Sequence, residues 1–209
     1  MIAVSGTECN AAARDKKQFQ IDIMYAGSRW KMKDLTYRIS KYPTSLWLSG
    51  SDVDAVIARA LNIWAGVTDL TFTQLRAGKA NIDIRFETGR HGDDQPFDGT
   101  GGFLAHSYFP LYGGDAHFDN SEHWTIDTYS GTNLLQTAAH EFGHSLGLAH
   151  SNQNKALMSP FYRGYQANVT LDKDDIIAIQ TLYGEKTKKE NSEFYNFFWK
   201  FWTMRYSVG

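Results

Sequence analysis

The spacing of apolar residues predicts four strands before residue 110. Over residues 34–42 apolar side chains alternate with polar ones, which is typical of a strand with one buried face. Residues 70–75 and 81–86 are also predicted to be strands, and a short turn-like stretch that contains a glycine separates them. A further strand is predicted over residues 102–109.

Three helices are predicted where apolar residues recur every three to four positions. The first begins at Ser51, which can supply its N-terminal cap, and ends near Gly66. The second begins near Asn133, and the third runs from near Asp172 to Gly184. The residues expected to be buried are Val53, Val56, Ile57, Ala60, Leu61 and Trp64 in the first helix and Ile176, Ile177, Ile179 and Leu182 in the third.

This order of strands and helices favours a single α+β domain. With 209 residues, of which 42% are hydrophobic, the chain can bury one sizeable core. The composition becomes strongly charged after residue 185, so the domain is predicted to span residues 30–185, between an N-terminal segment (1–29) and a C-terminal tail (186–209). Residues 89–114 are rich in glycine, aspartate and histidine, and such a long irregular stretch is unusual in a compact domain unless it is functional.

Charge and composition exclude several classes of partner and segment. The formal net charge is -2 with both signs interspersed, so no basic surface for nucleic acid is predicted. Cys9 is the only cysteine, which excludes a framework of internal disulfides. Residues 1–20 lack the pattern of a secretion signal, and no run of about 20 apolar residues predicts a membrane span.

The second predicted helix carries the residue types of a zinc site. His140 and His144 lie four positions apart, so both rings lie on one face of the helix. A catalytic zinc has three protein ligands and leaves a fourth position to water, and His150 is the candidate third ligand. A continuous helix would carry His150 roughly 9 Å beyond His144. Gly147 can adopt the left-handed conformation that ends a helix and lets the chain turn back. Glu141 is then placed beside the metal, as expected of a general base for the zinc-bound water.

The alternative is a surface helix that carries two histidines and a glutamate by chance. The added glycine and third histidine make that alternative roughly a thousandfold rarer on background frequencies. The string HEFGHSLGLAHS, followed by ALM and residues 160–162, resembles the catalytic domain of matrix metalloproteinases. Ser151 after His150 distinguishes this family from other metzincins. A methionine such as Met158 is on its own more often part of the core, but the resemblance implies that it forms a turn beneath the metal.

The resemblance covers about residues 30–184 and implies a metzincin-type fold, a twisted mixed β-sheet of about five strands with three α-helices. It also implies a structural zinc with four protein ligands, which leave no position for a reactive water. Its expected ligands are His91, Asp93, His106 and His117. A structural calcium is implied as well, because hard oxygen ligands on glycine-rich loops suit this ion, although solvated carboxylates are the alternative. Its expected residues are Asp98, Gly99, Gly101, Phe103, Asp119 and Glu122.

A second calcium site is implied, but with a weakened set of ligands. It would use Asp115 and the carbonyls of Leu111 and Gly113. Asn81 occupies the position of the remaining carboxylate, which removes one charge, so this site is expected to be weaker or empty. The cofactors expected from the resemblance are therefore two zinc ions and one or more calcium ions.

By resemblance, the chain is a zinc-dependent endopeptidase that acts on proteins, with extracellular matrix components as substrates, an extracellular location and a monomeric state. The carbonyl of Ala105 is expected to accept the scissile N–H of a substrate that lies antiparallel to its strand. An apolar residue after the scissile bond would enter a pocket walled by Pro160, Phe161 and Tyr162. Gln136, one helical turn before His140, would line the depth of this pocket.

Two other functions stay open, together with hypotheses for the flanks. One is a metal-holding binding protein without turnover, against which Glu141 argues, and the other is a metzincin with different substrates. Cys9 is a candidate inhibitory ligand of the zinc, although its neighbours do not match the family motif and a plain tail cysteine is the alternative. The tail has an aromatic helical stripe that would lie at a membrane surface or pack on the domain. This stripe comprises Phe194, Phe197, Phe198, Phe201 and Trp202.

Overall fold

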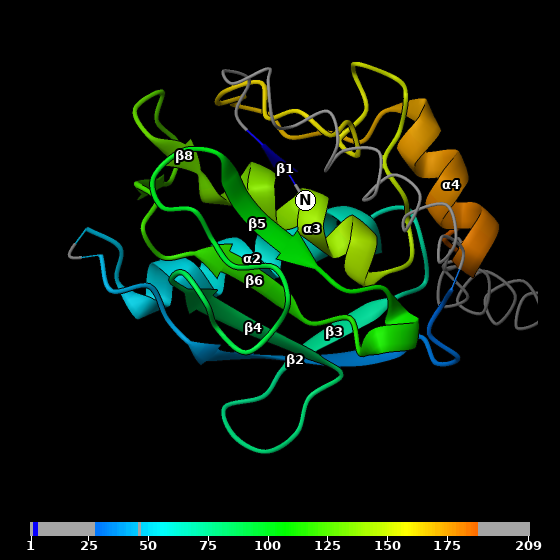
Figure 1. The fold of residues 1–209 in the computed structure, drawn as a ribbon. Coiled ribbons are helices and arrows are strands. Elements are labelled where there is room, and N and C mark those ends of the chain that lie inside the picture. Colours follow the sequence, from blue (N-terminus) through cyan, green and yellow to red (C-terminus); the bar gives the residue numbers. More distant parts are fainter. Residues whose placement is uncertain (1, 4–27, 46, 188–209) are drawn as a thin grey trace, which may run out of the picture.

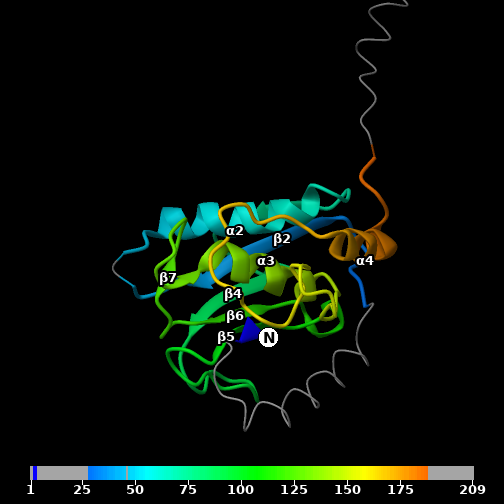
Figure 2. The same cartoon turned by 90° about the horizontal axis from the view of Figure 1, so that it is seen from above.

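The computed structural model describes residues 2–3, 28–45 and 47–187 of the chain. Cys9 and the aromatic stripe of the tail lie outside these residues, so the hypotheses for them stay predictions. Within the described ranges, no helix has the length and apolar character needed to cross a membrane. Figures 1 and 2 show one α+β domain in which two helices pack against each other and against a twisted sheet.

The main sheet is mixed and has the strand order β1-β5-β6-β4-β2-β3. Its strands are β1 (Ile2–Ala3), β2 (Asp34–Lys41), β3 (Thr71–Gln74), β4 (Ile82–Glu87), β5 (Phe103–Ser107) and β6 (Ala116–Asp119). Strands β3, β2, β4 and β6 run parallel, whereas β5 is antiparallel to β6 and β1 is antiparallel to β5. Five of these strands lie within the predicted domain, so the predicted fold class is confirmed.

The alternating pattern of β4 separates the core from an outer charged face. Ile82, Ile84 and Phe86 are completely buried, whereas the residues between them are partly exposed. The strands predicted over residues 34–42, 70–75, 81–86 and 102–109 correspond to β2, β3, β4 and β5. Strand β6 was not predicted, and neither were two short strands that pair in parallel, β7 (Trp124–Thr125) and β8 (Thr132–Asn133).

The first helix, α2 (Gly50–Ala65), packs its apolar stripe against α3 and the sheet. Its buried residues are Val53, Val56, Ile57, Ala60, Leu61 and Trp64, as predicted. The predicted cap at Ser51 is wrong, because the helix is capped by Ser49. The Ser49 hydroxyl accepts from the Asp52 N–H at 3.1 Å, and the Asp52 carboxylate accepts from the Ser49 N–H at 3.2 Å. This reciprocal pair satisfies two N–H groups at the start of the helix, and it places Ser51 inside the first turn.

The two later helices begin and end close to the predicted residues. Helix α3 (Leu134–Ser145) is buried along its whole length, and α4 (Lys173–Tyr183) is capped by Asp172 and followed by Gly184. The predicted burial of Ile177 is wrong, since its side chain is 64% exposed. The face of α4 that packs on the domain carries Asp175, Ile179 and Tyr183, which are spaced four positions apart. Ile177, two positions from Asp175, lies on the opposite side of the helix.

Candidate active site and metal centres

Three histidine side chains meet at the end of α3. His140 and His144 are buried one turn apart, and the helix ends after Ser145. Gly147 then has a φ of +105°, in the left-handed region, and the chain turns back so that Nε2 of His150 lies 3.1 Å from Nε2 of His144. Tetrahedral zinc with bonds of about 2.0–2.1 Å separates its ligand nitrogens by about 3.3 Å. The described geometry therefore fits a zinc ion held by three imidazoles.

Backbone carbonyls orient the two helical histidines. Nδ1 of His140 lies 2.7 Å from the carbonyl oxygen of Leu157, and Nδ1 of His144 lies 2.6 Å from that of Leu148. A carbonyl can only accept, so Nδ1 carries the proton in both rings and Nε2 is left with its lone pair, as a metal ligand requires. Burial lowers the pKa of both histidines well below the usual value, which keeps the rings neutral.

Nε2 of His140 provides an independent test of the fit to a metal. This atom is buried and has no hydrogen-bond partner among the described residues. Buried polar atoms are nearly always satisfied, so an orphaned imidazole nitrogen that faces two other histidines calls for a ligand such as zinc.

Met158 lies directly beneath α3, as the resemblance implied for a turn under the metal. Its Sδ atom is so close to Gly143 that a Cβ atom added there would stand 2.2 Å away. The turn is held by Asp175 of α4, whose carboxylate accepts from the N–H groups of Leu157 at 2.8 Å and Met158 at 3.1 Å. Asp175 was not predicted from the sequence, although a carboxylate among the apolar residues of a predicted helix is a signal that could have identified it.

Glu141 is completely buried next to the histidine site. It follows His140 on α3, and its Oε2 atom accepts a hydrogen bond of 2.8 Å from the hydroxyl of Ser107 on β5. Glu141 was predicted from the sequence to lie beside the metal, whereas no role was predicted for Ser107.

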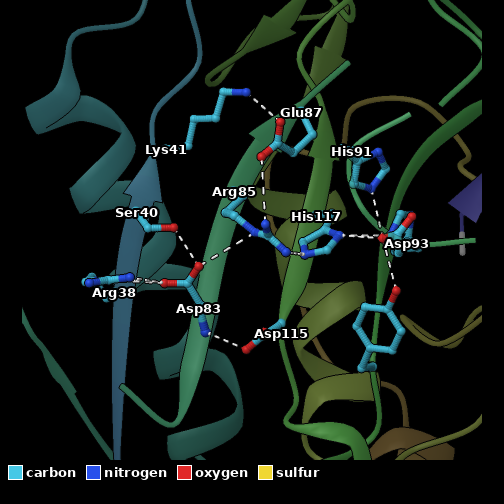
Figure 3. Close-up of polar contacts among 12 residues, drawn as sticks. Arg38, Ser40, Lys41, Asp83, Arg85, Glu87, His91, Asp93, Asp115 and His117 are labelled. Atoms are coloured by element: carbon cyan, nitrogen blue, oxygen red, sulfur yellow. Dashed lines mark hydrogen bonds and ion pairs between the residues drawn. The ribbon is translucent and has the colours of Figure 1, made fainter. Parts of the chain in front are cut away.

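The second cluster gathers around the carboxylate of Asp93 (Figure 3). Its Oδ2 atom lies 2.9 Å from Nε2 of His91, 3.0 Å from Nε2 of His106 and 2.9 Å from Nδ1 of His117. Three nitrogens and one carboxylate oxygen at these separations suit a tetrahedral zinc with no position left for water. The four residues predicted for the structural zinc are therefore brought together.

Burial and hydrogen bonds set the protonation states of the residues in this cluster. Burial lowers the pKa of His106 to about 3 and that of His117 to about 4, so both rings are neutral at physiological pH. Burial opposes ionisation of Asp93, but hydrogen bonds from the Gln95 N–H and from His106 hold the pKa of this carboxyl below its usual range. Neutral imidazoles and an ionised carboxylate are the protonation states that zinc requires.

A charged network on the outer face of β4 reaches the same cluster (Figure 3). Nη2 of Arg85 lies 2.6 Å from Nε2 of His117, and the Arg85 guanidinium lies between the carboxylates of Asp83 and Glu87. After burial, Arg85 is the main cause of the lowered pKa of His117. The contact of Arg85 with this cluster was not predicted from the sequence.

Three carboxylates meet the glycine-rich loop predicted to hold calcium. Asp98 accepts from the Phe103 N–H, Asp119 from the Gly99 N–H and Glu122 from the Gly101 N–H. Burial raises the pKa of Glu122, and the nearby charges of Asp119 and Asp98 raise it further. Each carboxylate thus accepts from a different N–H of the loop, and the calcium site stays a prediction.

The residues predicted for the second calcium have other partners in the structure. The amide oxygen of Asn81 accepts from the N–H and the hydroxyl of Thr36, each at 2.9 Å. Asp115 accepts from the Asp83 N–H at 2.9 Å. Leu111 and Gly113 lie at the short helix η1 (Pro110–Tyr112) and its cap. The amide oxygen of Asn81 is thus already committed, and the second site stays a prediction.

The residues predicted to bind substrate lie on β5, on α3 and in the segment that follows the third histidine. Ala105 is on β5, and its register partner on β1 is Ile2. Gln136 is 5% exposed in the first turn of α3, and its Oε1 atom has no hydrogen-bond partner among the described residues. The hydroxyl of Tyr162 accepts from the Asn133 N–H at 2.9 Å, which attaches residues 160–162 to the start of α3. Gln136 and Tyr162 therefore both lie at the N-terminal end of this helix.

A mixed sheet over a helix that carries two histidines and a buried glutamate, with a third histidine meeting them from the segment after the helix, defines the class of zinc metallopeptidases. Residues 29–184 match the Matrixin family model of the M10 peptidases, and the chain belongs to this family. The predicted family, that of matrix metalloproteinases, is therefore confirmed.

Curated relatives agree with this family. The chain is 50% identical to stromelysin-3 of Homo sapiens over 165 residues, which are 78% of this chain and 33% of the relative. It is 50% identical to interstitial collagenase of Bos taurus over 159 residues, 75% of this chain and 33% of the relative. It is 48% identical to macrophage metalloelastase of Rattus norvegicus over 164 residues, 77% of this chain and 35% of the relative. The chain thus spans about a third of the length of these relatives.

Proposed function

We propose that residues 30–185 form the catalytic domain of a zinc-dependent endopeptidase, preceded by an N-terminal segment (1–29) and followed by a tail (186–209). The observation that carries this proposal is the meeting of His140, His144 and His150 beside a buried glutamate, with an orphaned nitrogen on His140. Membership of the Matrixin family supports it.

The chemistry divides between the metal and Glu141. Zinc bound by three histidines lowers the pKa of a bound water toward about 7 and polarises a carbonyl oxygen. Glu141 takes a proton from the attacking water and passes it to the leaving amine, so that one residue acts first as base and then as acid. Burial of Glu141 excludes bulk water that would compete for this proton.

Strand β5 has β6 on one edge and β1 on the other, and in the proposal an extended substrate takes the place of β1 along β5. An isolated strand edge offers its N–H and carbonyl groups to an added peptide. Antiparallel pairing of β1 with β5, with Ile2 opposite Ala105 and Ala3 opposite Phe103, supports the idea that this edge accepts a peptide in that direction. In the proposal, the Ala105 carbonyl accepts the N–H of the scissile bond.

The residue after the scissile bond enters a pocket at the start of α3. Pro160, Phe161 and Tyr162 form its wall, and Gln136 lines its depth. The hydrogen bond between Tyr162 and Asn133 and the burial of Gln136 support this arrangement. An apolar side chain is favoured, because the first two turns of α3 carry the apolar residues Leu134, Leu135, Ala138 and Ala139.

The cofactors proposed are two zinc ions and one or more calcium ions. The Asp93 cluster would hold the second zinc and stabilise the fold rather than react, because its four protein ligands complete a tetrahedron. The carboxylates around residues 98–103 would hold calcium, and Asn81, Leu111, Gly113 and Asp115 would provide at most a weak second calcium site.

Protein substrates of the extracellular matrix, an extracellular location and a monomeric state are proposed for the whole protein. Relatives named stromelysin, interstitial collagenase and macrophage metalloelastase support the substrate class and the location. Nucleic acid is not a proposed partner, because the net charge of -2 provides no basic surface.

A quenched fluorescent peptide with leucine after the central bond tests the proposed function. The zinc-loaded chain should cleave it, a strong zinc chelator should abolish cleavage, and added zinc should restore it. The matched control is the same peptide with aspartate after the central bond, which should be cleaved far more slowly. Cleavage that survives complete removal of zinc, or no cleavage by the fully loaded chain, would contradict the proposal.

A further inference from the structure

Ser107 connects the strand that would bind substrate to the proposed general base. It is the last residue of β5, and its hydroxyl lies 2.8 Å from Oε2 and 2.7 Å from the backbone carbonyl oxygen of Glu141. Side chains alternate along β5, so His106 reaches the Asp93 cluster while Ser107 faces α3. One short strand therefore carries both a proposed zinc ligand and a hydroxyl that contacts Glu141.

The hydrogen bond restricts the Glu141 carboxylate. The terminal torsion of a glutamate side chain is broad and has no sharp preference of its own. A hydroxyl that donates to an ionised carboxylate forms one of the stronger hydrogen bonds in proteins, and here it forms at a completely buried group. The contact therefore selects one plane for the carboxylate and commits Oε2 to Ser107.

The second contact joins the Ser107 hydroxyl to the backbone of Glu141. The hydroxyl lies within hydrogen-bond distance of two acceptors, the carboxylate oxygen and the backbone carbonyl of the same residue. The serine is therefore held against both the side chain and the backbone of Glu141.

We propose that Ser107 is a positioning residue for Glu141, and this inference rests on the proposed function. By holding Oε2, it presents Oε1 to the attacking water, so the proton lost by the water arrives on Oε1 as the water oxygen bonds to the scissile carbon. The same proton then leaves Oε1 for the nitrogen of the departing amine as the carbon–nitrogen bond breaks. Ser107 itself neither gains nor loses a proton.

A purely structural role makes a different prediction. As a link between β5 and α3 alone, the hydroxyl would contribute to stability, and its loss would lower the melting temperature without a selective effect on turnover. A positioning role changes kcat while KM and the zinc content stay the same, because the carboxylate is misaligned by a small displacement. Displacements of about 1 Å cost on the order of a hundredfold in rate.

The experiment compares the parent with Ser107→Ala, Ser107→Thr and the control Thr137→Val. Thr137 is also buried and its hydroxyl also donates to a backbone carbonyl, that of Asn133 at 3.1 Å, but it does not contact Glu141. Each chain is tested for kcat and KM on the quenched peptide, for zinc content and for melting temperature. Ser107→Ala should lose about tenfold to a hundredfold in kcat at unchanged KM and zinc content, whereas Ser107→Thr and Thr137→Val should stay within about threefold of the parent.

Inhibitor binding provides a readout that needs no turnover. A peptide hydroxamate offers a hydroxyl that donates to the carboxylate of the base, whereas a peptide thiol of the same sequence binds the zinc without this contact. By calorimetry, Ser107→Ala should weaken binding of the hydroxamate about tenfold and leave binding of the thiol unchanged. If the parent has no peptidase activity, the proposed function fails, and this comparison still tests the contact.

Several results would overturn the positioning role. They are a parent-like kcat in folded, zinc-loaded Ser107→Ala, an equal loss in Ser107→Thr, an equal loss in Thr137→Val, and parallel weakening of both inhibitors. If Ser107→Ala does not fold, Ser107→Cys replaces it, since it keeps the size of the side chain with a weaker donor. A parent-like kcat and hydroxamate affinity in that variant would also contradict the role.

Discussion

Gly143 and Met158 approach so closely that no side chain can stand between them. A Cβ atom added to Gly143 would lie 2.2 Å from Sδ of Met158 and 3.0 Å from Cζ2 of Trp64. Gly143 precedes His144, so its lack of a side chain lets the methionine turn support α3 directly under the histidine site. The part of α3 that carries His140 and His144 is thus tightly packed against the methionine turn.

This contact predicts that Gly143→Ala overpacks the core. Inserting one methyl group where no space exists typically costs about 1–3 kcal/mol, so the free energy of unfolding should fall by that amount in a urea titration. The control is Gly50→Ala in α2, where the added Cβ atom would lie 3.6 Å from Cε1 of Tyr42, an ordinary contact. Gly50→Ala should leave stability unchanged or raise it, and equal effects of both substitutions would contradict the packing argument.

A second stability prediction concerns Asp175, which holds the methionine turn from α4. Replacement by alanine would remove the acceptor of two buried N–H groups, those of Leu157 and Met158. Each unsatisfied buried donor costs about 1–3 kcal/mol, so Asp175→Ala should lower the melting temperature markedly. Asp174→Ala, which changes a neighbouring exposed carboxylate, is the control. A melting temperature as high as that of the control would show that the turn does not depend on Asp175.

The sequence predicted best those features that local rules determine. The apolar stripe of α2, the strand alternation of β2 and β4 and the helix end at Gly147 each follow from the chemistry of a few neighbouring residues. The cluster of His140, His144 and His150 was predicted because residue type and spacing limit metal binding strongly, whereas the Asp93 cluster was predicted from the resemblance to matrix metalloproteinases.

Features that depend on tertiary packing were missed. Ile177 was expected to be buried because α4 has several apolar residues, but only tertiary packing decides which face lies against the domain. The cap of α2 is Ser49 and not Ser51. Several nearby residues can cap a helix, and the reciprocal hydrogen bonds between Ser49 and Asp52 decide between them. Ser107 and Arg85 contact residues that are 34 and 32 positions away, and no local pattern indicates such pairs.

The Asp93 cluster is predicted to be a structural metal site, so His91→Ala should affect stability. Loss of one of the four ligands should lower the number of bound zinc ions from two to one and reduce the melting temperature. His123→Ala is the control, because His123 stacks on Trp47 and belongs to neither histidine cluster. Metal analysis that still finds two zinc ions in His91→Ala, together with an unchanged melting temperature, would contradict the assignment.

The depth of the substrate pocket is predicted to depend on Gln136. Its buried carbonyl oxygen has no hydrogen-bond partner among the described residues. An unsatisfied buried amide costs roughly 1–3 kcal/mol. A long apolar substrate group that lies against this amide therefore gains little binding free energy. The parent should therefore prefer leucine or methionine after the scissile bond, and Gln136→Leu should improve cleavage of a substrate with a biphenyl-type side chain. The measurement is the ratio of kcat/KM for the two substrates. Identical ratios in the parent and in Gln136→Leu would exclude a role for Gln136 in the pocket.

Turnover by the zinc-loaded Glu141→Ala chain tests the proposed mechanism most directly. The substitution removes the general base but none of the three histidines, so the variant should still bind two zinc ions. Its kcat on the quenched peptide should fall by about two to four decades, the usual effect of a lost general base. Near-normal turnover in a variant whose zinc content is confirmed to equal that of the parent would contradict the assignment of Glu141 as the base.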